Sequence, residues 1–506
     1  MVEKLEKLGD KMVTTMQNNV SQSLALVFGI AMMTWSAFNQ MNSNYWSFFM
    51  TDICGLEPTL MGTIKSISAI GAWIFVIVAA FISEKIWLRH GAYRSWFAVA
   101  PIATAICLML TWVNPVGILG VAGASIWMIV FYMLGQFCVN FFQIAAAAII
   151  PAISHTEADS ALMSARKAQG NMIIKVLFAI ISLPCILLIN SAIYGVSYDD
   201  GKGAGFAGFF IVALVLAVWM VVMYWIFFKQ LAGKDPTEPQ CQARYEAKKR
   251  GEKIDIQIEK KAQEKLSLFE IIKLWITNIP ALIVLVGELG RFIAQTLVQG
   301  LAIYIFTYVY GDITMSAIFM TIVNIVGLCA TFVADPLAKK LGIKTTYVIG
   351  VSIALACCLL CFVVGALNMW VFTVLVGGIF FGMNFQNATF LGMGANACRY
   401  GEWRDGKVPR SFIVSTYQWC PQISNAVAGI AMGTGLSAIG YVKGMDPDPA
   451  MAQGFINLIA TIPSIFFGIS LVLLLVAYPL GKKRMEEINA DLAKRSAEKE
   501  NASAED

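Results

Sequence analysis

The chain has 506 residues, of which 58% are hydrophobic and only 14% are charged. Soluble domains are roughly 45–50% apolar and about 25% charged, so both values indicate a membrane protein. The composition excludes a disordered chain, a secreted disulfide scaffold and a conventional cytosolic enzyme. The net charge of +5 is modest and lies on one side of the predicted membrane, so we expect no nucleic-acid partner.

Twelve apolar segments with short polar breaks follow one another along the chain. A helix crosses the hydrocarbon layer with about 20 residues, so each segment is long enough to span it. The segments therefore predict an all-α polytopic membrane protein with twelve transmembrane helices in two six-helix bundles. The predicted spans are 20–50, 59–82, 95–113, 117–150, 169–192, 205–228, 274–309, 313–334, 346–366, 370–396, 412–437 and 455–480.

Polar stretches at both ends and in the middle divide the chain into regions. The expected regions are an N-terminal segment (1–19), a first bundle (20–228), a central loop (229–267), a second bundle (268–480) and a charged tail (481–506). Most of the 37 lysines and arginines fall in one set of loops, and only Lys202 and Lys443 fall in the opposite set. Because basic loops stay inside, we expect both termini and the central loop to be cytoplasmic in the plasma (inner) membrane.

The 11 cysteines and two histidines form no pattern of catalysis or metal binding. Cys358 and Cys361 have CxxC spacing, but no second pair or histidine accompanies them. His90 and His155 both fall in polar loops. No nucleotide-binding or hydrolase motif occurs, so we expect no catalytic residue, no metal, no cofactor and no enzymatic activity.

Two loops at equivalent places in the two halves carry similar charges, as expected of a transporter built from repeats. Glu84 and Arg89 flank the first loop, and Asp335 and Lys340 flank the second. An acid at a helix end that pairs with a loop base can latch one conformational state. The alternative is a solvated turn whose positive charge only sets the orientation.

Three stretches resemble a known family. They are NYWSFFMTDICGLEPTLMGTI with RHGAYRSW, which lie between Asn44 and Trp96, PAISHTEADSALMSAR (151–166), and ACRYGEWRDGKVPRSF (397–412). They resemble motifs of the glycoside–pentoside–hexuronide (GPH) cation symporter family, the group that contains melibiose permease. This family belongs to the major facilitator superfamily. The resemblance implies the major facilitator fold and transport of a sugar or glycoside, usually with Na⁺ or H⁺.

The sequence departs from that family where the coupling cation binds. The family's two second-helix aspartates fall here on Ala72 and Val76, and its fourth-helix threonine falls on Asn140. A hard cation needs several oxygen ligands, usually including a carboxylate. The resemblance therefore implies a permease, while these positions argue against the usual sodium site.

The positions that hold sugar in the family are also changed. In the alignment that the resemblance implies, Ser36, Gln143 and Gln422 stand where the family has charged residues. Arg399 stands where the family motif "DYGEW" has its aspartate, and the family's arginine is retained as Arg166. Amides and indoles suit a neutral polyol, although such residues also bond neighbouring helices to one another. The predicted substrate-binding residues are Ser36, Asn39, Gln143, Arg166, Gln418, Trp419 and Gln422.

Glu288 and Arg291 are three residues apart within an apolar segment, so they face the same side of a helix. Charges within a membrane are costly and usually functional, and we expect a coupling or gating role. The alternative is a self-neutralised structural pair.

We expect a secondary transporter for a sugar, glycoside or related small polar solute. It would work by alternating access in the lipid bilayer as a monomer, and be proton-coupled or facilitative rather than sodium-coupled. A transporter-like sensor and a polytopic membrane enzyme are the alternatives.

Overall fold

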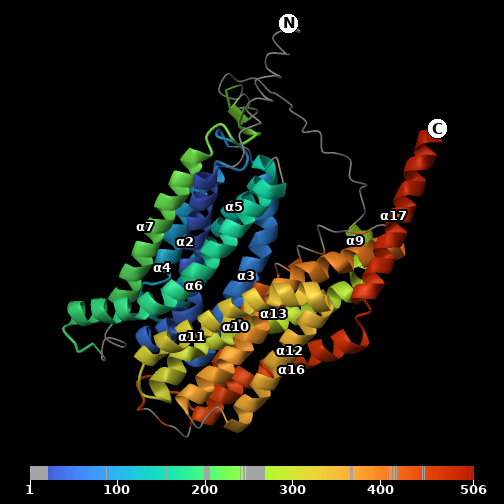
Figure 1. The fold of residues 1–506 in the computed structure, drawn as a ribbon. Helices are drawn as coiled ribbons and strands as arrows, with labels where there is room; N and C mark the ends of the chain where they lie inside the picture. Colours follow the sequence, from blue (N-terminus) through green and yellow to red (C-terminus); the bar gives the residue numbers. More distant parts are fainter. Residues whose placement is uncertain are drawn as a thin grey trace. The chain divides into compact units, whose positions relative to one another are not determined.

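The computed structural model consists of helices joined by turns, with no β-strand among the residues that it describes (Figure 1). Residues outside the description are 1–20, 87, 155–156, 199–204, 240, 243–244, 247–267, 365–367, 407, 409–412, 414–415, 418, 447, 449–450 and 506. The side chains of some helical residues, among them Glu84 and Asp335, are also outside it. The all-α class is confirmed.

The chain divides into two compact units, Met1–Leu56 with Ile70–Ile258, and Glu57–Ala69 with Glu259–Asp506. The second boundary lies inside the predicted central loop, but the first part of one helix, α3, belongs with the second unit. The predicted bounds of the two bundles therefore stay a prediction.

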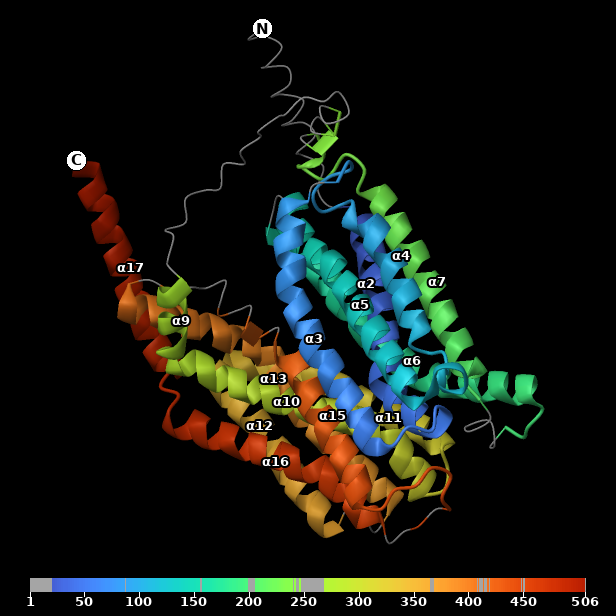
Figure 2. The ribbon, with the colours of Figure 1, turned by 180° about the vertical axis from the view of Figure 1, so that it is seen from behind.

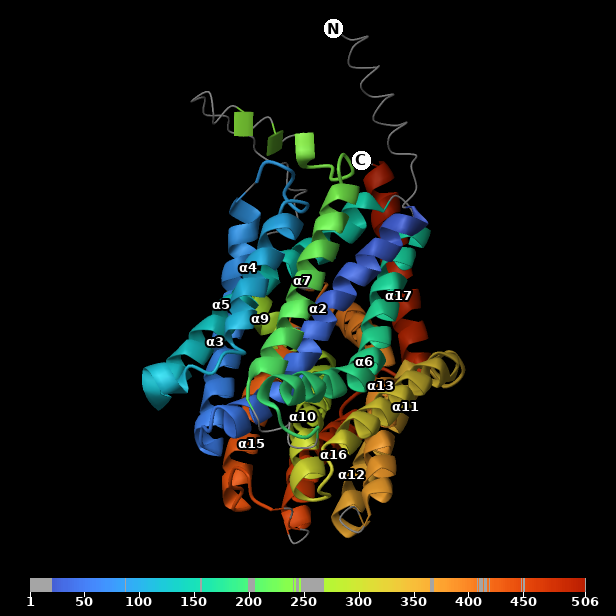
Figure 3. The same cartoon turned by 90° about the vertical axis from the view of Figure 1, so that its left-hand side faces the viewer.

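The first unit contains the helices from the N-terminal half of the chain, coloured blue to green in Figure 1. They are α2 (Gln22–Phe48), the π-helix η1 (Phe49–Ile53), most of α3 (Pro58–Lys85), α4 (Trp96–Leu110), α5 (Val116–Ile153), α6 (Glu157–Tyr194) and α7 (Ala207–Gln230). Helix α2 packs against both α6 and α7, and Figure 3 shows it between them.

The second unit contains the helices of the C-terminal half, and Figure 2 shows α10 alongside α15 and α16, against which it packs. They are α9 (Leu268–Ile276), α10 (Ile279–Tyr308), α11 (Thr314–Leu341), α12 (Ile343–Val364), α13 (Met369–Asp405), α15 (Cys420–Ala438), α16 (Ala452–Val476) and α17 (Lys482–Glu505).

Ten of the described helices are long and apolar enough to cross a membrane. Helix α4, with 15 residues, and α15, with 19, occupy the two remaining predicted segments, 95–113 and 412–437. Each of the twelve predicted spans therefore coincides with a helix, and ten satisfy the length and hydropathy of a span. Helix α6 starts well before the predicted residue 169, and α13 continues to Asp405, so polar residues extend both helices beyond their apolar parts.

Glycines allow close helix packing in each unit. In the first unit, a Cβ on Gly29 of α2 would lie 2.7 Å from the Arg166 carbonyl oxygen, and one on Gly170 of α6 would lie 2.6 Å from the Gly29 carbonyl oxygen. In the second unit, a Cβ on Gly62 would lie 2.6 Å from the Gly429 carbonyl oxygen. A real Cβ never comes so close, so these contacts require glycine and fix the separation of the helix backbones.

Candidate functional site

The predicted solute-binding residues of the first unit lie on α2, α5 and α6. The hydroxyl of Ser36 donates to Asn171 Oδ1 of α6 at 2.6 Å, Asn39 is exposed, and Gln143 on α5 is half-buried. Ser36 is therefore already engaged in an interhelical hydrogen bond, which was the alternative to solute binding. Nothing in these contacts assigns Asn39 or Gln143 to a solute, so their role stays a prediction.

The backbone of Arg166 packs closely against Gly29 of α2. Its Nη1 donates to Gln169 Oε1 at 3.0 Å and its Nη2 to Gln22 Oε1 at 3.4 Å. Its Nε is buried without a hydrogen-bond partner among the described residues. A buried donor without a partner costs free energy, so this guanidinium has an unused donor for an oxygen-bearing ligand.

In the second unit, Trp419 and Gln422 lie at the start of α15. The Trp419 ring meets the Trp275 ring edge to face at 6.3 Å, and the Gln422 Oε1 atom is buried without a partner in the part of the chain described. Gln418 lies outside the described residues. The arrangement offers a half-buried indole and an unused amide acceptor, both of which suit a polyol.

Glu288 and Arg291 form the ion pair that their spacing on α10 suggests. Arg291 Nη2 and Nε both donate to Glu288 Oε2, at 2.6 and 3.0 Å. The two side chains are only 1% and 8% exposed. Arg291 also lies over the Phe292 ring, 4.1 Å from its centre. The pair is thus deeply buried, and its coupling or gating role stays a prediction.

The predicted pairing of a helix-end acid with a loop base stays a prediction in both halves, because the side chains of Glu84 and Asp335 lie outside the described residues. Arg89 instead lies over the Tyr245 ring at 5.5 Å, and Lys340 is exposed. The loop before α4 has a different acidic partner, which sequence reasoning missed.

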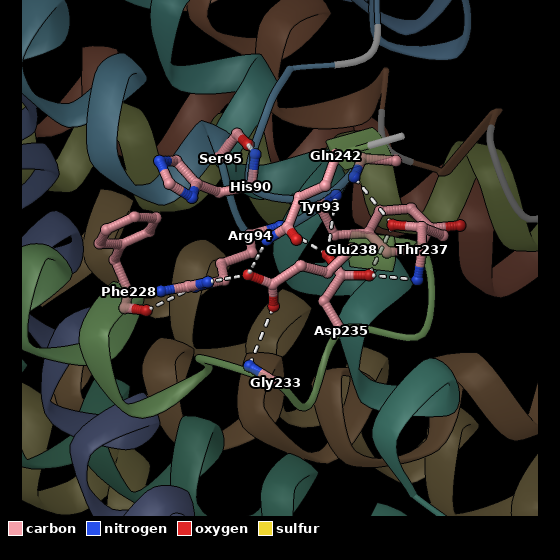
Figure 4. Close-up of polar contacts among 11 residues, drawn as sticks. His90, Tyr93, Arg94, Ser95, Phe228, Gly233, Asp235, Thr237, Glu238 and Gln242 are labelled. Atoms are coloured by element: carbon pink, nitrogen blue, oxygen red, sulfur yellow. Dashed lines mark hydrogen bonds and ion pairs between the residues drawn. The ribbon is translucent and has the colours of Figure 1, made fainter. Parts of the chain in front are cut away.

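That partner is the segment after α7, and Figure 4 shows the contacts. Arg94 forms an ion pair with Glu238 and donates from Nε to the Phe228 carbonyl oxygen at 2.9 Å. Asp235 Oδ2 accepts the backbone N–H of Tyr93 and of Arg94, at 3.3 and 2.9 Å. We call Arg94, Asp235 and Glu238 with these contacts the loop clamp. All three residues are buried.

Local turn chemistry prepares the acidic half of the loop clamp. Asp235 Oδ1 accepts the backbone N–H of Thr237 at 2.9 Å, and Glu238 Oε2 accepts that of Gly233 at the same distance. The sequence Asp-Pro-Thr-Glu is typical of a helix start, and this signal could have drawn attention to the segment. Burial raises the pKa of the Tyr93 hydroxyl, and the charge of Asp235 raises it further, so Tyr93 stays neutral.

Arg399 also has a partner that sequence reasoning missed. Its Nη1 donates to Asn489 Oδ1 of α17 at 3.0 Å, and Trp403 Nε1 donates to Asp491 Oδ2 at 3.2 Å. Arg495 Nη1 of α17 returns a bond to the Trp403 carbonyl oxygen at 2.9 Å. The arginine that departs from "DYGEW" thus helps to fasten the C-terminal helix to the end of α13.

Comparison with known proteins decides the family. The sequence matches a protein-family model described as "MFS/sugar transport protein" over residues 27–482. The chain belongs to this family. The match confirms the expected membership of the sugar-transporting major facilitator proteins, and with the ten apolar helices it makes the chain a multi-pass membrane protein.

Similar proteins carry names of the same kind. The chain is 25% identical over 478 residues to the isoprimeverose transporter of Lactiplantibacillus pentosus, covering 92% of this chain and 89% of that one. It is 21% identical to the raffinose carrier protein of Pediococcus pentosaceus, covering 92% and 70%. The solved D-xylose–proton symporter has a TM-score of 0.64 at 12% identity, covering 90% and 98%, and confirms the major facilitator fold.

Proposed function

We propose that the protein moves a sugar, glycoside or related small polar solute across the plasma membrane by alternating access. The family match over residues 27–482 is the observation that carries this proposal. The proposal includes a monomer with both termini in the cytoplasm, and transport rather than catalysis. Relatives named for isoprimeverose and raffinose support a saccharide as the solute class.

The polar residues near the proposed solute site suit a neutral saccharide. Gln422 has a buried amide oxygen without a partner among the described residues, and Trp419 presents an indole. An amide both accepts and donates hydrogen bonds, as sugar hydroxyls do, and an aromatic ring packs on the apolar face of a sugar. These features support recognition of hydroxyl groups without requiring a charged solute.

An anionic sugar derivative is the second candidate. The unused Nε donor of Arg166 favours it, because a guanidinium binds carboxylate and sulfonate groups through two parallel bonds. One relative, 27% identical over 228 residues that cover 44% of this chain, is named a putative sulfoquinovose importer of Escherichia coli. A panel of neutral sugars, glycosides, uronates and sulfonated sugars separates the two candidates.

The experiment is uptake of labelled panel members into vesicles that contain the purified protein. We expect at least one saccharide to enter, and we expect equal rates in Na⁺ and K⁺ media at fixed pH and membrane potential. The reason is that Ala72 and Val76 supply no oxygen ligand and Asn140 supplies only an amide. Uptake that rises steeply with Na⁺ would contradict sodium independence, and no uptake of any panel member would contradict the proposed function.

Arg166→Lys should weaken solute binding about tenfold or more, which corresponds to about 1.4 kcal/mol. Lysine keeps the charge but loses the fork of donors that includes the unused Nε. The measurement is the Kd of the transported solute by titration calorimetry. Arg484→Lys is the control, because that exposed guanidinium pairs with Glu487 on α17. Unchanged Kd and turnover in Arg166→Lys would show that Arg166 only anchors the helix.

A further inference from the structure

Two aromatic pairs connect α2 and α5 in the first unit. The Trp46 ring stacks on the Tyr132 ring with the ring centres 4.4 Å apart, and the Trp35 ring meets the Phe142 ring edge to face at 5.8 Å. Helix α2 packs closely on α6 and α7, and it meets α5 through these large side chains. The higher-numbered residue of α2 pairs with the lower-numbered residue of α5, so the two helices run antiparallel.

The aromatic pairs also fix which residues of the two helices lie opposite each other. Asn42 lies four residues before Trp46 on α2, and Gln136 lies four residues after Tyr132 on α5. Residues four apart share a helix face, so each side chain is on the face of its helix that carries the stacked ring. Because the helices are antiparallel, Asn42 and Gln136 are at the same level, one turn inward from the stacked pair.

The polar atoms of α2 at this level are buried and unused. Asn42 is only 5% exposed, and neither its Nδ2 nor its Oδ1 atom has a hydrogen-bond partner among the described residues. The indole Nε1 atom of Trp46 is likewise buried without a partner in the described part of the chain. Gln136 differs, because its side chain is hydrogen-bonded to the Tyr132 hydroxyl. Buried donors and acceptors without partners are costly, so this arrangement indicates a place for a polar ligand.

The chemistry of these atoms fits an uncharged hydroxyl group. The Asn42 amide provides both a donor and an acceptor, and the Trp46 indole provides a second donor. A hydroxyl group likewise both donates and accepts, so it can satisfy atoms of both kinds. The same face of α2 reaches solvent nearby, because Asn39, three residues before Asn42, is exposed. A small number of polar groups between aromatic rings is typical of a ligand site.

We propose that Asn42 and Trp46, opposite Gln136, form a subsite that binds a hydroxyl group of the transported saccharide. This inference rests on the proposed transport function and adds residues that select the solute. Asn42 is six residues from Ser36, or about 9 Å along the helix, so the subsite is separate from the contacts expected around Ser36 and Arg166. A solute without a hydroxyl group at this end leaves the Asn42 amide unpaired and binds more weakly.

Replacement of Asn42 by leucine should have opposite effects on stability and on binding. Leucine is similar in size and removes two buried polar atoms that have no partner in the solute-free protein, so we expect Tm to rise by about 1–3 °C. The same change removes the partner of the solute hydroxyl, so we expect the Kd to rise about tenfold or more. A residue whose role is structural does not show this combination, because its loss lowers Tm.

The test measures both quantities on the full-length protein purified in detergent. Thermal unfolding without sugar gives Tm, and titration calorimetry gives the Kd of the neutral sugar or glycoside from the uptake panel that the wild type binds most tightly. Asn190→Leu is the matched control, because Asn190 is a fully buried amide of the first unit that accepts the backbone N–H of Gly208 at 2.6 Å and donates to the Gly205 carbonyl oxygen. We expect this control to lower Tm and to keep the Kd of its folded fraction.

Every outcome bears on the subsite. An unchanged Kd in Asn42→Leu overturns it and is the result expected if only a buried water bonds the amide. A lower Tm in Asn42→Leu also overturns it, because the amide would then have a structural role. If Asn42→Leu does not fold, Asn42→Ala replaces it, and its Kd must rise about tenfold while Asn190→Ala leaves the Kd unchanged. A wild type that binds no panel member contradicts the proposed function itself, which is a different result from failure of the subsite alone.

Discussion

Replacing either Glu288 or Arg291 alone should destabilise the protein more than replacing both together. Removal of one partner leaves an uncompensated charge in a site that is 1–8% exposed, and such a change costs about 3–5 kcal/mol. Replacement of both partners removes the stranded charge, and buried pairs exchanged for uncharged residues of similar size are often neutral in stability. We therefore expect low yield or low Tm for Glu288→Gln and Arg291→Gln, and recovery in the double variant.

The measurement is a double-mutant cycle of thermal unfolding in detergent, with folded yield as a second readout. The control cycle uses Arg484 and Glu487 of α17, which have the same spacing but side chains that are 46% and 61% exposed. Exposed pairs couple by at most about 1 kcal/mol. Additive losses at Glu288 and Arg291 would show that neither side chain depends on the other, which would contradict a compensating ion pair.

Glu238→Gln should also cause a large loss of stability, because it opens the loop clamp. Arg94 would keep its bond to the Phe228 carbonyl but lose its carboxylate while it remains buried. We expect about 3 kcal/mol or more, as for other buried pairs that lose one partner. Asp235→Asn should have a smaller effect, since Arg94 keeps its ion pair with Glu238. The single amide oxygen still accepts one of the two backbone N–H groups, that of Arg94 or that of Thr237, which bond separate oxygens of the carboxylate.

Thermal unfolding of the purified variants checks this prediction, with Glu487→Gln as the exposed control. If Glu238→Gln and Glu487→Gln lower Tm equally, the loop clamp does not stabilise the first unit. Protease cleavage after Lys234 provides a local readout, because release of the segment after α7 should expose that bond and raise the rate of cutting.

The membrane-embedded features of this fold were predictable because they follow from local rules. Apolar length located the helices, since a span must bury its own backbone hydrogen bonds. The contact between Glu288 and Arg291 was predictable because residues three apart share a helix face. Both properties depend on neighbours within one element, so a single sequence contains them.

The contacts that were missed join elements far apart in the chain. Arg94 and Glu238 are separated by 144 residues, and Arg399 and Asn489 by 90. No spacing rule relates such residues, so a loop arginine shows its charge but not its partner. Asn171 on α6, the hydrogen-bond partner of Ser36, is 135 residues away in the chain and could not be predicted for the same reason. The first part of α3 belongs with the second unit because of where it packs. Hydropathy contains no information about that packing, so this assignment could not be predicted.

Solute counterflow in liposomes tests the proposed transport most directly. Liposomes that contain the purified protein are loaded with a high concentration of one unlabelled saccharide and diluted into a trace of the same labelled saccharide, with no ion gradient. A secondary transporter gives a transient rise of label inside to well above the outside concentration, whether or not a coupling ion takes part. Label that never exceeds simple equilibration for any saccharide, glycoside or sugar acid, in liposomes with folded protein, would contradict secondary transport of a saccharide.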